Sequence, residues 1–401
     1  MDRRGFLKQM AAGVACSAAA HPWMTTVTLA ETGGGGALGD HRLIVIILRG
    51  AMDGLDAVQP LGDPLFAQYR PTIGVNTGAV PLDGYFALHP GLAGLKPLWD
   101  AGELGFVHAV STPYRDKRSH FYGQDLLEAG TGTDVAGGPQ ARDGWLNRML
   151  QVVPGLRAET AYAMGLEAAP MLAGAAPVLN WSPETRLNLS AQGQLLLERM
   201  YHDDPLFRDS ASEAMALMQI DVPERDHMAV GAARKMADTD ALADFAADRM
   251  TGATRIAAFS LSGWDTHRMQ ATTITSSMAG LERLILRLRD QLGRQVWAKT
   301  TLLTMTEFGR TARENGSRGT DHGTGGVMLT AGGAVRGGRV AGRWPGLAEA
   351  DLYDRRDLMP TSDVRDWAAW AMRGLYGFDR SLLETAVFPG LIMGDDPGLI
   401  L

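Results

Sequence analysis

The sequence has one cysteine, no excess of positive charge and, after its first residues, no long apolar run. Cys16 lies near the N-terminus, and if it leaves with a signal peptide, the mature chain has no disulfide, thiol nucleophile or zinc–thiolate site. The formal net charge of −7 does not favour a nucleic-acid partner. No stretch has the ~20 apolar residues of a bilayer span, so we expect no integral membrane helix. The sequence contains no P-loop and no dinucleotide-binding fingerprint. An oxidoreductase is therefore suggested by the export route alone.

The N-terminus, in contrast, carries a recognisable pattern. Arg3 and Arg4 precede Phe-Leu-Lys and an Ala-rich run, which indicates a twin-arginine export signal over residues 1–30. The alternative is the basic start of an amphipathic helix. Residues 31–41 are Gly-rich and read as a linker. We therefore expect a periplasmic or extracellular protein, with the cleavage point left open.

Three carboxylates each follow a short apolar run that is typical of a buried strand. They are Asp53, Asp265 and Glu307, after residues 43–48, 256–261 and 301–305. Ligands of open α/β sheets bind beyond the carboxyl ends of the strands, so parallel neighbours would bring these acids together. Clustered carboxylates repel one another unless they hold a cation or keep a proton. The pattern favours a metal site.

The order of elements predicts a single α/β domain over residues 42–401, with a mostly parallel sheet flanked by helices. A helical pattern at 278–292 lies between two strand candidates, which makes a right-handed βαβ crossover. Residues 155–250 show few strand signals, so we expect a helical insertion there, with helices at 191–201, 209–218 and 230–251. Further strands are expected at 105–110 and 327–330.

Two histidines join the acids as candidate metal ligands. Asp265 and His267 are two residues apart and point the same way on an extended segment. Asp321 and His322 lie in a Gly-rich segment that lets backbone approach a site closely. The alternatives are a turn cap at Asp265, solvated loop histidines, and for Glu307 a buried ion pair.

Ser119 lies at the start of an expected helix, where an N-cap role competes with a role as nucleophile. Arg115 lies close by and would attract anions. Arg310 could pair with Glu307 or point at a bound oxyanion. His120 could be a proton donor or only a helix residue.

Several motifs in order give the chain a resemblance to a family. They are ILRGAMDGLDAVQP, PYRDKRSHF, SGWDTH, TEFGRT and GTDHGTGG. Together they resemble the domain-of-unknown-function family 1501, which looks like a branch of the alkaline phosphatase and sulfatase superfamily. The resemblance implies two metal sites. One would use Asp53, Ser119 and Glu307, and the other Asp265, His267 and His322. Phe308 stands where the superfamily has a histidine, so one site lacks an imidazole.

From these features we expect an exported, metal-dependent hydrolase of phosphate or sulfate esters, with Ser119 as nucleophile. Its cofactor would be one or more divalent ions, zinc with calcium or magnesium. Its substrate would be an anionic small molecule or a polysaccharide ester, and the sequence identifies no protein partner. The alternative is a non-catalytic exported protein of the same fold that binds a polysaccharide or a protein.

Overall fold

The computed structural model describes most of the chain beyond the N-terminal segment. The described residues are 38–74, 78–115, 118–133, 139–165, 167, 169–183 and 227–401, with side chains described from 237 onward in the last range. The expected signal peptide, most of the linker and the helices expected at 191–201 and 209–218 lie outside these residues. No helix in the described part of the chain is long and apolar enough to cross a membrane.

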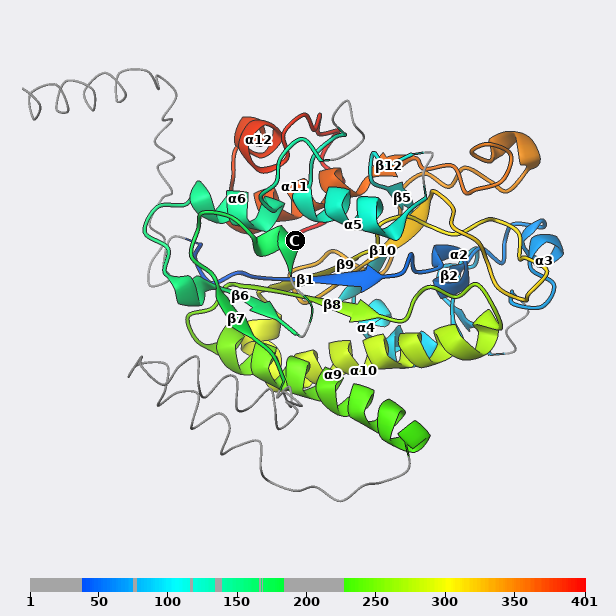
Figure 1. Cartoon of the computed structure of the whole chain (residues 1–401), viewed down its shortest axis with the longest axis horizontal. Helices are drawn as coiled ribbons and strands as arrows, with labels where there is room; N and C mark the ends of the chain where they lie inside the picture. Colours follow the sequence, from blue (N-terminus) through cyan, green and yellow to red (C-terminus); the bar gives the residue numbers. More distant parts are fainter. Residues whose placement is uncertain are drawn as a thin grey trace, which may run out of the picture.

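A nine-stranded, mostly parallel sheet forms the middle layer (Figure 1). Its order is β11-β5-β10-β9-β1-β8-β6-β7, and β12 pairs with β5. The strands are β1 (Arg42–Arg49), β5 (Leu104–Ser111), β6 (Ala161–Met164), β7 (Leu179–Trp181), β8 (Ile256–Ser262), β9 (Thr300–Met305), β10 (Gly326–Ala331), β11 (Val340–Ala341) and β12 (Ser362–Asp363). A second sheet contains β2 (Val58–Gln59), β4 (Ala87–Leu88) and β3 (Val80–Pro81). The expected class, a mostly parallel sheet flanked by helices, is confirmed.

Strand β1 shows why the sheet has two covered faces. Leu43, Val45 and Ile47 belong to one hydrophobic cluster, whereas Ile44 and Ile46 belong to another. Side chains alternate across a strand, so a continuous apolar run must be buried on both sides. Each fully buried aliphatic side chain contributes about 1.5–3 kcal/mol relative to an exposed one.

Helices cover both faces (Figure 1). On one side α10 (Gln270–Trp297) packs against α9 (His227–Thr251), with α4 (Lys96–Asp100) nearby. On the other side lie α5 (His120–Ala129), α6 (Trp145–Gln151), α11 (Val364–Tyr376) and α12 (Arg380–Leu382). The short helices α2 (Gly54–Ala57) and α3 (Phe66–Tyr69) lie at the end toward which β1 points. The helix expected at 278–292 is therefore the middle of α10.

The expected helical insertion at 155–250 needs correction in its first part. Residues 161–164 and 179–181 form β6 and β7, which extend the main sheet beyond β8. These strands have only four and three residues, too few to show an alternating pattern. The helix expected at 230–251 lies within α9.

The strand directions place several loops at one edge. Strand β1 is parallel to β8 and β9, while β10 is antiparallel to both β9 and β5. The carboxyl ends of β1, β5, β8 and β9 therefore meet there, together with the start of β10. Residues that follow the first four strands, or precede β10, are neighbours at this edge.

Candidate metal centre

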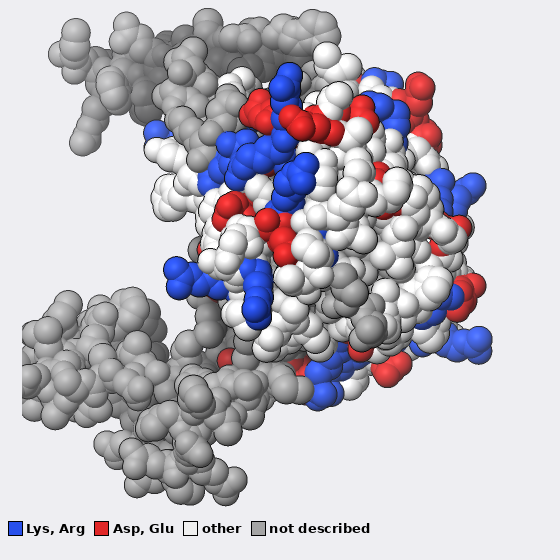
Figure 2. Space-filling model, turned by 90° about the vertical axis from the view of Figure 1, so that its right-hand side faces the viewer, with Lys and Arg blue, Asp and Glu red and all other residues white. Residues whose placement is uncertain are grey.

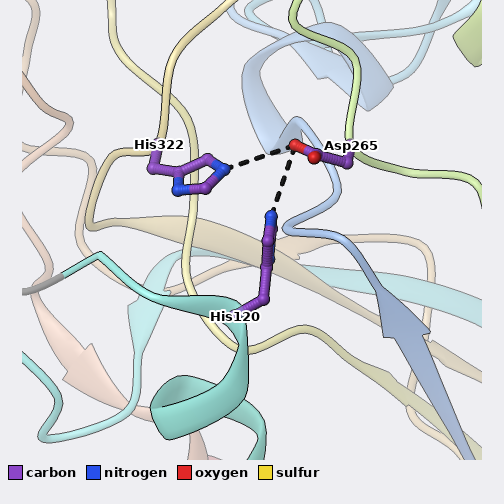
Figure 3. Close-up of side chains that lie close together, drawn as sticks. All are labelled: His120, Asp265 and His322. Carbon is purple, nitrogen blue, oxygen red and sulfur yellow. Dashed lines mark hydrogen bonds and ion pairs between the residues drawn. The ribbon is translucent and has the colours of Figure 1, made fainter.

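Three imidazoles surround one carboxylate oxygen at this edge. Oδ1 of Asp265 lies 2.9 Å from Nε2 of His267, and 3.3 Å from Nε2 of both His120 and His322. The Nε2 atoms of His267 and His322 are 3.0 Å apart. Figure 3 shows His120, at the start of α5, and His322, from a loop, both directed at Asp265. Ligand atoms of His120, Asp265 and His322 lie within 4.8 Å of one another, and this is the group among the described residues that could hold a metal ion.

The outer nitrogen of each ring lies near an acceptor. Nδ1 of His120 is 2.7 Å from Oε1 of Glu307, and Nδ1 of His322 is 2.7 Å from the carbonyl oxygen of Arg118. Nδ1 of His267 is 3.4 Å from Oδ1 of Asp321. A carbonyl oxygen only accepts, so the ring of His322 carries its proton on Nδ1. Histidines that bind metals usually donate their second nitrogen in this way, which leaves the Nε2 lone pair for the ion.

Two observations test whether a cation fits between these groups. Nε2 of His120 is buried and makes no hydrogen bond of good geometry, only the 3.3 Å contact with Oδ1 of Asp265, although its ring is held on the other side. Ligands bound tetrahedrally at 2.0–2.1 Å lie about 3.3 Å from one another, close to the separations seen here. Imidazole nitrogens with one carboxylate oxygen are a donor set that suits zinc and other divalent transition metals. The residues therefore fit such an ion.

The local electrostatics also favour positive charge at this point. A hydrogen bond with Glu307 raises the pKa of His120 despite burial of the ring. Burial works against the charge on Asp265, yet the guanidinium of Arg310 and the nearby histidines lower the pKa of Asp265 to about 2. Asp265 therefore stays ionised and available as an anionic ligand.

Glu307 and Asp321 lie behind the imidazoles rather than between them. Oε1 of Glu307 accepts hydrogen bonds from the backbone N–H of Gly50 at 2.9 Å and from Nε2 of Gln124 at 3.0 Å, besides facing His120. Burial would raise the pKa of Glu307, but these hydrogen bonds outweigh it and lower the pKa. Oε1 of Glu307 meets His120 at Nδ1, the ring nitrogen that does not face Asp265, and Oε2 of Glu307 lies 3.0 Å from Oγ1 of Thr306. Glu307 thus orients the ring of His120.

Asp53 lies in a separate buried network. Its Oδ2 is 2.7 Å from both Nη1 of Arg70 and Nε2 of Gln270, and its Oδ1 accepts from the backbone N–H of Leu55 at 3.1 Å. The side chains of Asp53 and Arg70 are fully buried. The guanidinium neutralises this carboxylate, and Asp53 also caps α2. The geometry therefore differs from the two ligand sets that the resemblance implies: it builds one centre, around Asp265.

The guanidinium groups of Arg310 and Arg115 donate hydrogen bonds to acceptors within the protein. Arg310 is buried and donates to the carbonyl oxygens of Ala51, Thr320, Gly50 and Trp264, and to Oδ1 of Asp265 at 2.6 Å. Nη1 of Arg115 bonds to the carbonyl oxygens of Thr112 and Tyr114. Arg310 therefore fixes Asp265 and does not face a substrate anion.

Ser119 is half-buried and directly precedes His120 at the start of α5. Its hydroxyl makes no cap hydrogen bond, while its backbone N–H donates to the hydroxyl of Tyr114 at 2.8 Å. Ser119 therefore does not cap α5 with its hydroxyl, and the capping role that competes with a nucleophilic one is absent. The ring of Phe308 stacks on that of His120, with 5.3 Å between the two ring centroids.

Local sequence patterns carry little information on His120 and Gln124. The sequence predicts only a proton donor or a helix residue at His120, which follows Ser119 at a helix start. Gln124 lies four residues later, on the same side of α5, so both side chains reach Glu307. Close approach of the strand ends requires Gly50: its φ is +116°, and a Cβ there would lie 2.6 Å from the backbone nitrogen of Asp265.

Comparison with solved structures finds similar folds at low identity. A lipoteichoic acid synthase, LtaP, from Listeria monocytogenes is 9% identical with a TM-score of 0.40, covering 88% of this chain and 77% of that one. Alkaline phosphatase from the Antarctic bacterium TAB5 is 10% identical with a TM-score of 0.31, covering 73% and 91%. The periplasmic domain of EcEptC from Escherichia coli, in complex with Zn, is 8% identical with a TM-score of 0.33, covering 75% of each. Identities of 8–10% concern the fold alone.

Comparison of the sequence with known proteins gives a more specific result. No curated protein matches the chain. The family described as "Protein of unknown function (DUF1501)" matches residues 110–369, which is more than half of the chain and includes all three histidines of the centre. The chain belongs to the DUF1501 family.

Proposed function

We propose that the protein is a metal-dependent hydrolase of phosphate or sulfate esters with one divalent cation per chain. The observation that carries the proposal is the convergence of three Nε2 atoms on Oδ1 of Asp265, with an acceptor beside each outer nitrogen. His120, Asp265, His267 and His322 would hold the ion, for which zinc is the best match. When bound, it would supply Lewis-acid stabilisation of charge on the ester.

The residues of the chain have separate tasks in this proposal. Ser119 is the candidate nucleophile, because its hydroxyl is not used as a cap and it adjoins His120 at a helix N-terminus, where negative charge is favoured. Glu307 keeps the proton of His120 on Nδ1, and Arg310 keeps Asp265 ionised and in place. Ester hydrolysis of this kind depends on positioning and electrostatics more than on general acids and bases.

Elemental analysis and a substrate panel test the proposal together. We expect one transition-metal ion per chain in the wild type and almost none in Asp265→Ala. Cleavage of p-nitrophenyl phosphate or p-nitrophenyl sulfate should be lost in Asp265→Ala and should fall at least 100-fold in Ser119→Ala, which keeps the ion. Equal rates for Ser119→Ala and wild type would remove the serine from the mechanism. A wild type without bound metal would refute the centre.

The alternative is a non-catalytic protein of the same fold that keeps the ion. The hydrogen bonds of Arg310 within the protein favour this alternative, because a hydrolase needs positive groups that face the transferring anion. The same measurements separate the two functions, since this alternative predicts one ion per chain and no turnover of either ester.

We also infer export by the twin-arginine route, from the sequence around Arg3 and Arg4. This route generally carries folded proteins, which suits a metal centre that is filled before export. Cell fractionation of the full chain and of an Arg3→Lys, Arg4→Lys double variant tests it. Retention of the variant in the cytoplasm is the expected result, and unchanged export of the variant would contradict the inference.

A further inference from the structure

Arginine side chains gather around a buried carboxylate next to the metal centre. Asp357 is fully buried, and its Oδ2 accepts hydrogen bonds from Nη2 of Arg118 at 2.9 Å and from Oγ1 of Thr324 at 2.9 Å. Nη1 of Arg356 lies 3.1 Å from its Oδ1. One carboxylate thus holds arginines from two segments that are far apart in the sequence. We call Arg118 and Arg356, together with the exposed Arg355 that directly precedes Arg356, the arginine cluster.

The arginine cluster is fixed to His322. The carbonyl oxygen of Arg118 faces Nδ1 of His322, and Nη2 of Arg356 donates to the carbonyl oxygen of His322 at 3.0 Å. Arg115 lies over the ring of Tyr353, at the start of the turn that carries Arg355 and Arg356. A group bound to these arginines would therefore lie beside a substrate held at the centre.

The backbone around the arginine cluster is strained. Arg118, Asp354 and Arg355 have φ values of +46°, +51° and +54°, in the left-handed region that residues other than glycine rarely adopt. They are three of the seven such residues in the described part of the chain. Strain of this kind is unfavourable and tends to persist at ligand-binding sites. Here it presents the arginines at the rim of the site.

The charges of this region leave an excess of positive charge that solvent can reach. The arginine cluster has three guanidinium groups, while Asp354 and Asp357, which pair with Arg118 and Arg356, supply two carboxylates, and Arg355 is exposed. The side chains of Arg118 and Arg356 are 25% and 39% exposed. The end of the molecule toward which β1 and β8 point shows basic and acidic side chains in mixed groups, without a broad field of one sign (Figure 2). The excess is therefore local, as for a subsite that takes one anionic group.

Exposed aromatic residues lie next to the centre as well. Phe121 and Tyr122 directly follow His120, and their side chains are 74% and 43% exposed. Their rings meet edge to face at 6.1 Å. Exposed rings offer apolar faces on which a sugar ring can pack, while their neighbours bind its polar groups. A carbohydrate matches this combination of aromatic and basic side chains.

We propose that the arginine cluster is a second anion subsite and that the substrate is a polyanionic glycan. This deepens the proposed function and rests on it: one sulfate or phosphate ester would occupy the centre while a neighbouring anionic group binds the arginines. Guanidinium groups suit both anions because their planar N–H forks match the oxygen geometry. The net charge of −7 for the whole chain makes long-range attraction of nucleic acid unfavourable.

Binding of defined polymers to the metal-containing protein tests the subsite without requiring turnover. By titration calorimetry we expect wild type to bind dextran sulfate, with affinity that falls as salt rises, and to ignore uncharged dextran. An Arg355→Gln, Arg356→Gln double variant should bind dextran sulfate at least tenfold more weakly. The control is Arg283→Gln, Arg287→Gln on α10, which removes the same charge from exposed pairs with Asp240 and Asp244 and should bind as wild type does. Melting curves establish that all three proteins are folded.

Each other outcome is decisive. Absent dextran sulfate binding, or equal loss in both double variants, would overturn the subsite. Polyphosphate that binds as tightly as dextran sulfate, or anionic phospholipid vesicles that bind where dextran sulfate does not, would overturn the glycan as the partner. Dextran sulfate binding without cleavage of any ester would remove the hydrolase proposal and leave the subsite standing.

Discussion

Asp53 and Asp265 lie at the same edge of the sheet, but their negative charges are compensated in different ways. Asp53 is fully buried, and its carboxylate accepts hydrogen bonds from the guanidinium of Arg70 and the side-chain amide of Gln270. Asp265 is about half exposed, takes one guanidinium from Arg310, and still faces three imidazole nitrogens. A buried carboxylate that is fully paired is structural, whereas one beside a buried imidazole nitrogen that makes no hydrogen bond of good geometry has a place for a cation. Proximity of acids to a strand end is therefore insufficient to identify ligands.

The largest expected effect comes from removing the partner of Asp53. Arg70→Met leaves a buried carboxylate without its cation, so the free energy of unfolding should fall by about 3–5 kcal/mol. Urea unfolding measures this loss. Arg283→Met removes an exposed partner of Asp240 and should cost at most about 1 kcal/mol.

The same variant also tests the difference between the two regions. Metal content of folded Arg70→Met should remain one ion per chain, because the centre around Asp265 is untouched. A second bound ion would show that Asp53 is a ligand when it is released, and would end the distinction between a structural and a metal-binding carboxylate.

A smaller effect concerns Asp56, beside Asp53. Burial and the charge of Asp53 raise the pKa of Asp56 to about 6, against an ordinary value near 4. Between these values the folded protein holds more protons than the unfolded chain, so stability falls as pH rises through this window. A shift of about two pKa units corresponds to about 3 kcal/mol. Asp56→Asn should lose this pH dependence, so that its stability relative to wild type rises between pH 4 and pH 8 in urea titrations. Parallel curves for the two proteins would contradict it.

The sequence predicted which strands carry the site, but it could not predict which side chains pair with one another there. Apolar runs gave β1, β8 and β9 as parallel neighbours, and the strand-end rule brought Asp53, Asp265 and Glu307 to one edge. Gln270, however, reaches Asp53 from 217 residues away, a long-range contact that no local pattern contains. The direction of His120 depends on packing against Phe308, which only the assembled fold provides.

The smallest of these effects separates a ligand from a residue that orients one. Glu307→Gln keeps the size of the side chain but removes the charge that faces Nδ1 of His120, so metal affinity should fall about 10–100-fold, the usual cost of losing such a partner. Competition with a chelator of known affinity measures this value, and the Co²⁺-substituted protein reports the ligand set by its visible spectrum. An unchanged spectrum with weaker binding is what a positioning role requires, because all four ligands stay bound. A spectrum that changes with the loss of one oxygen ligand would place Glu307 on the ion, and the contrast with Asp53 would then need another physical cause.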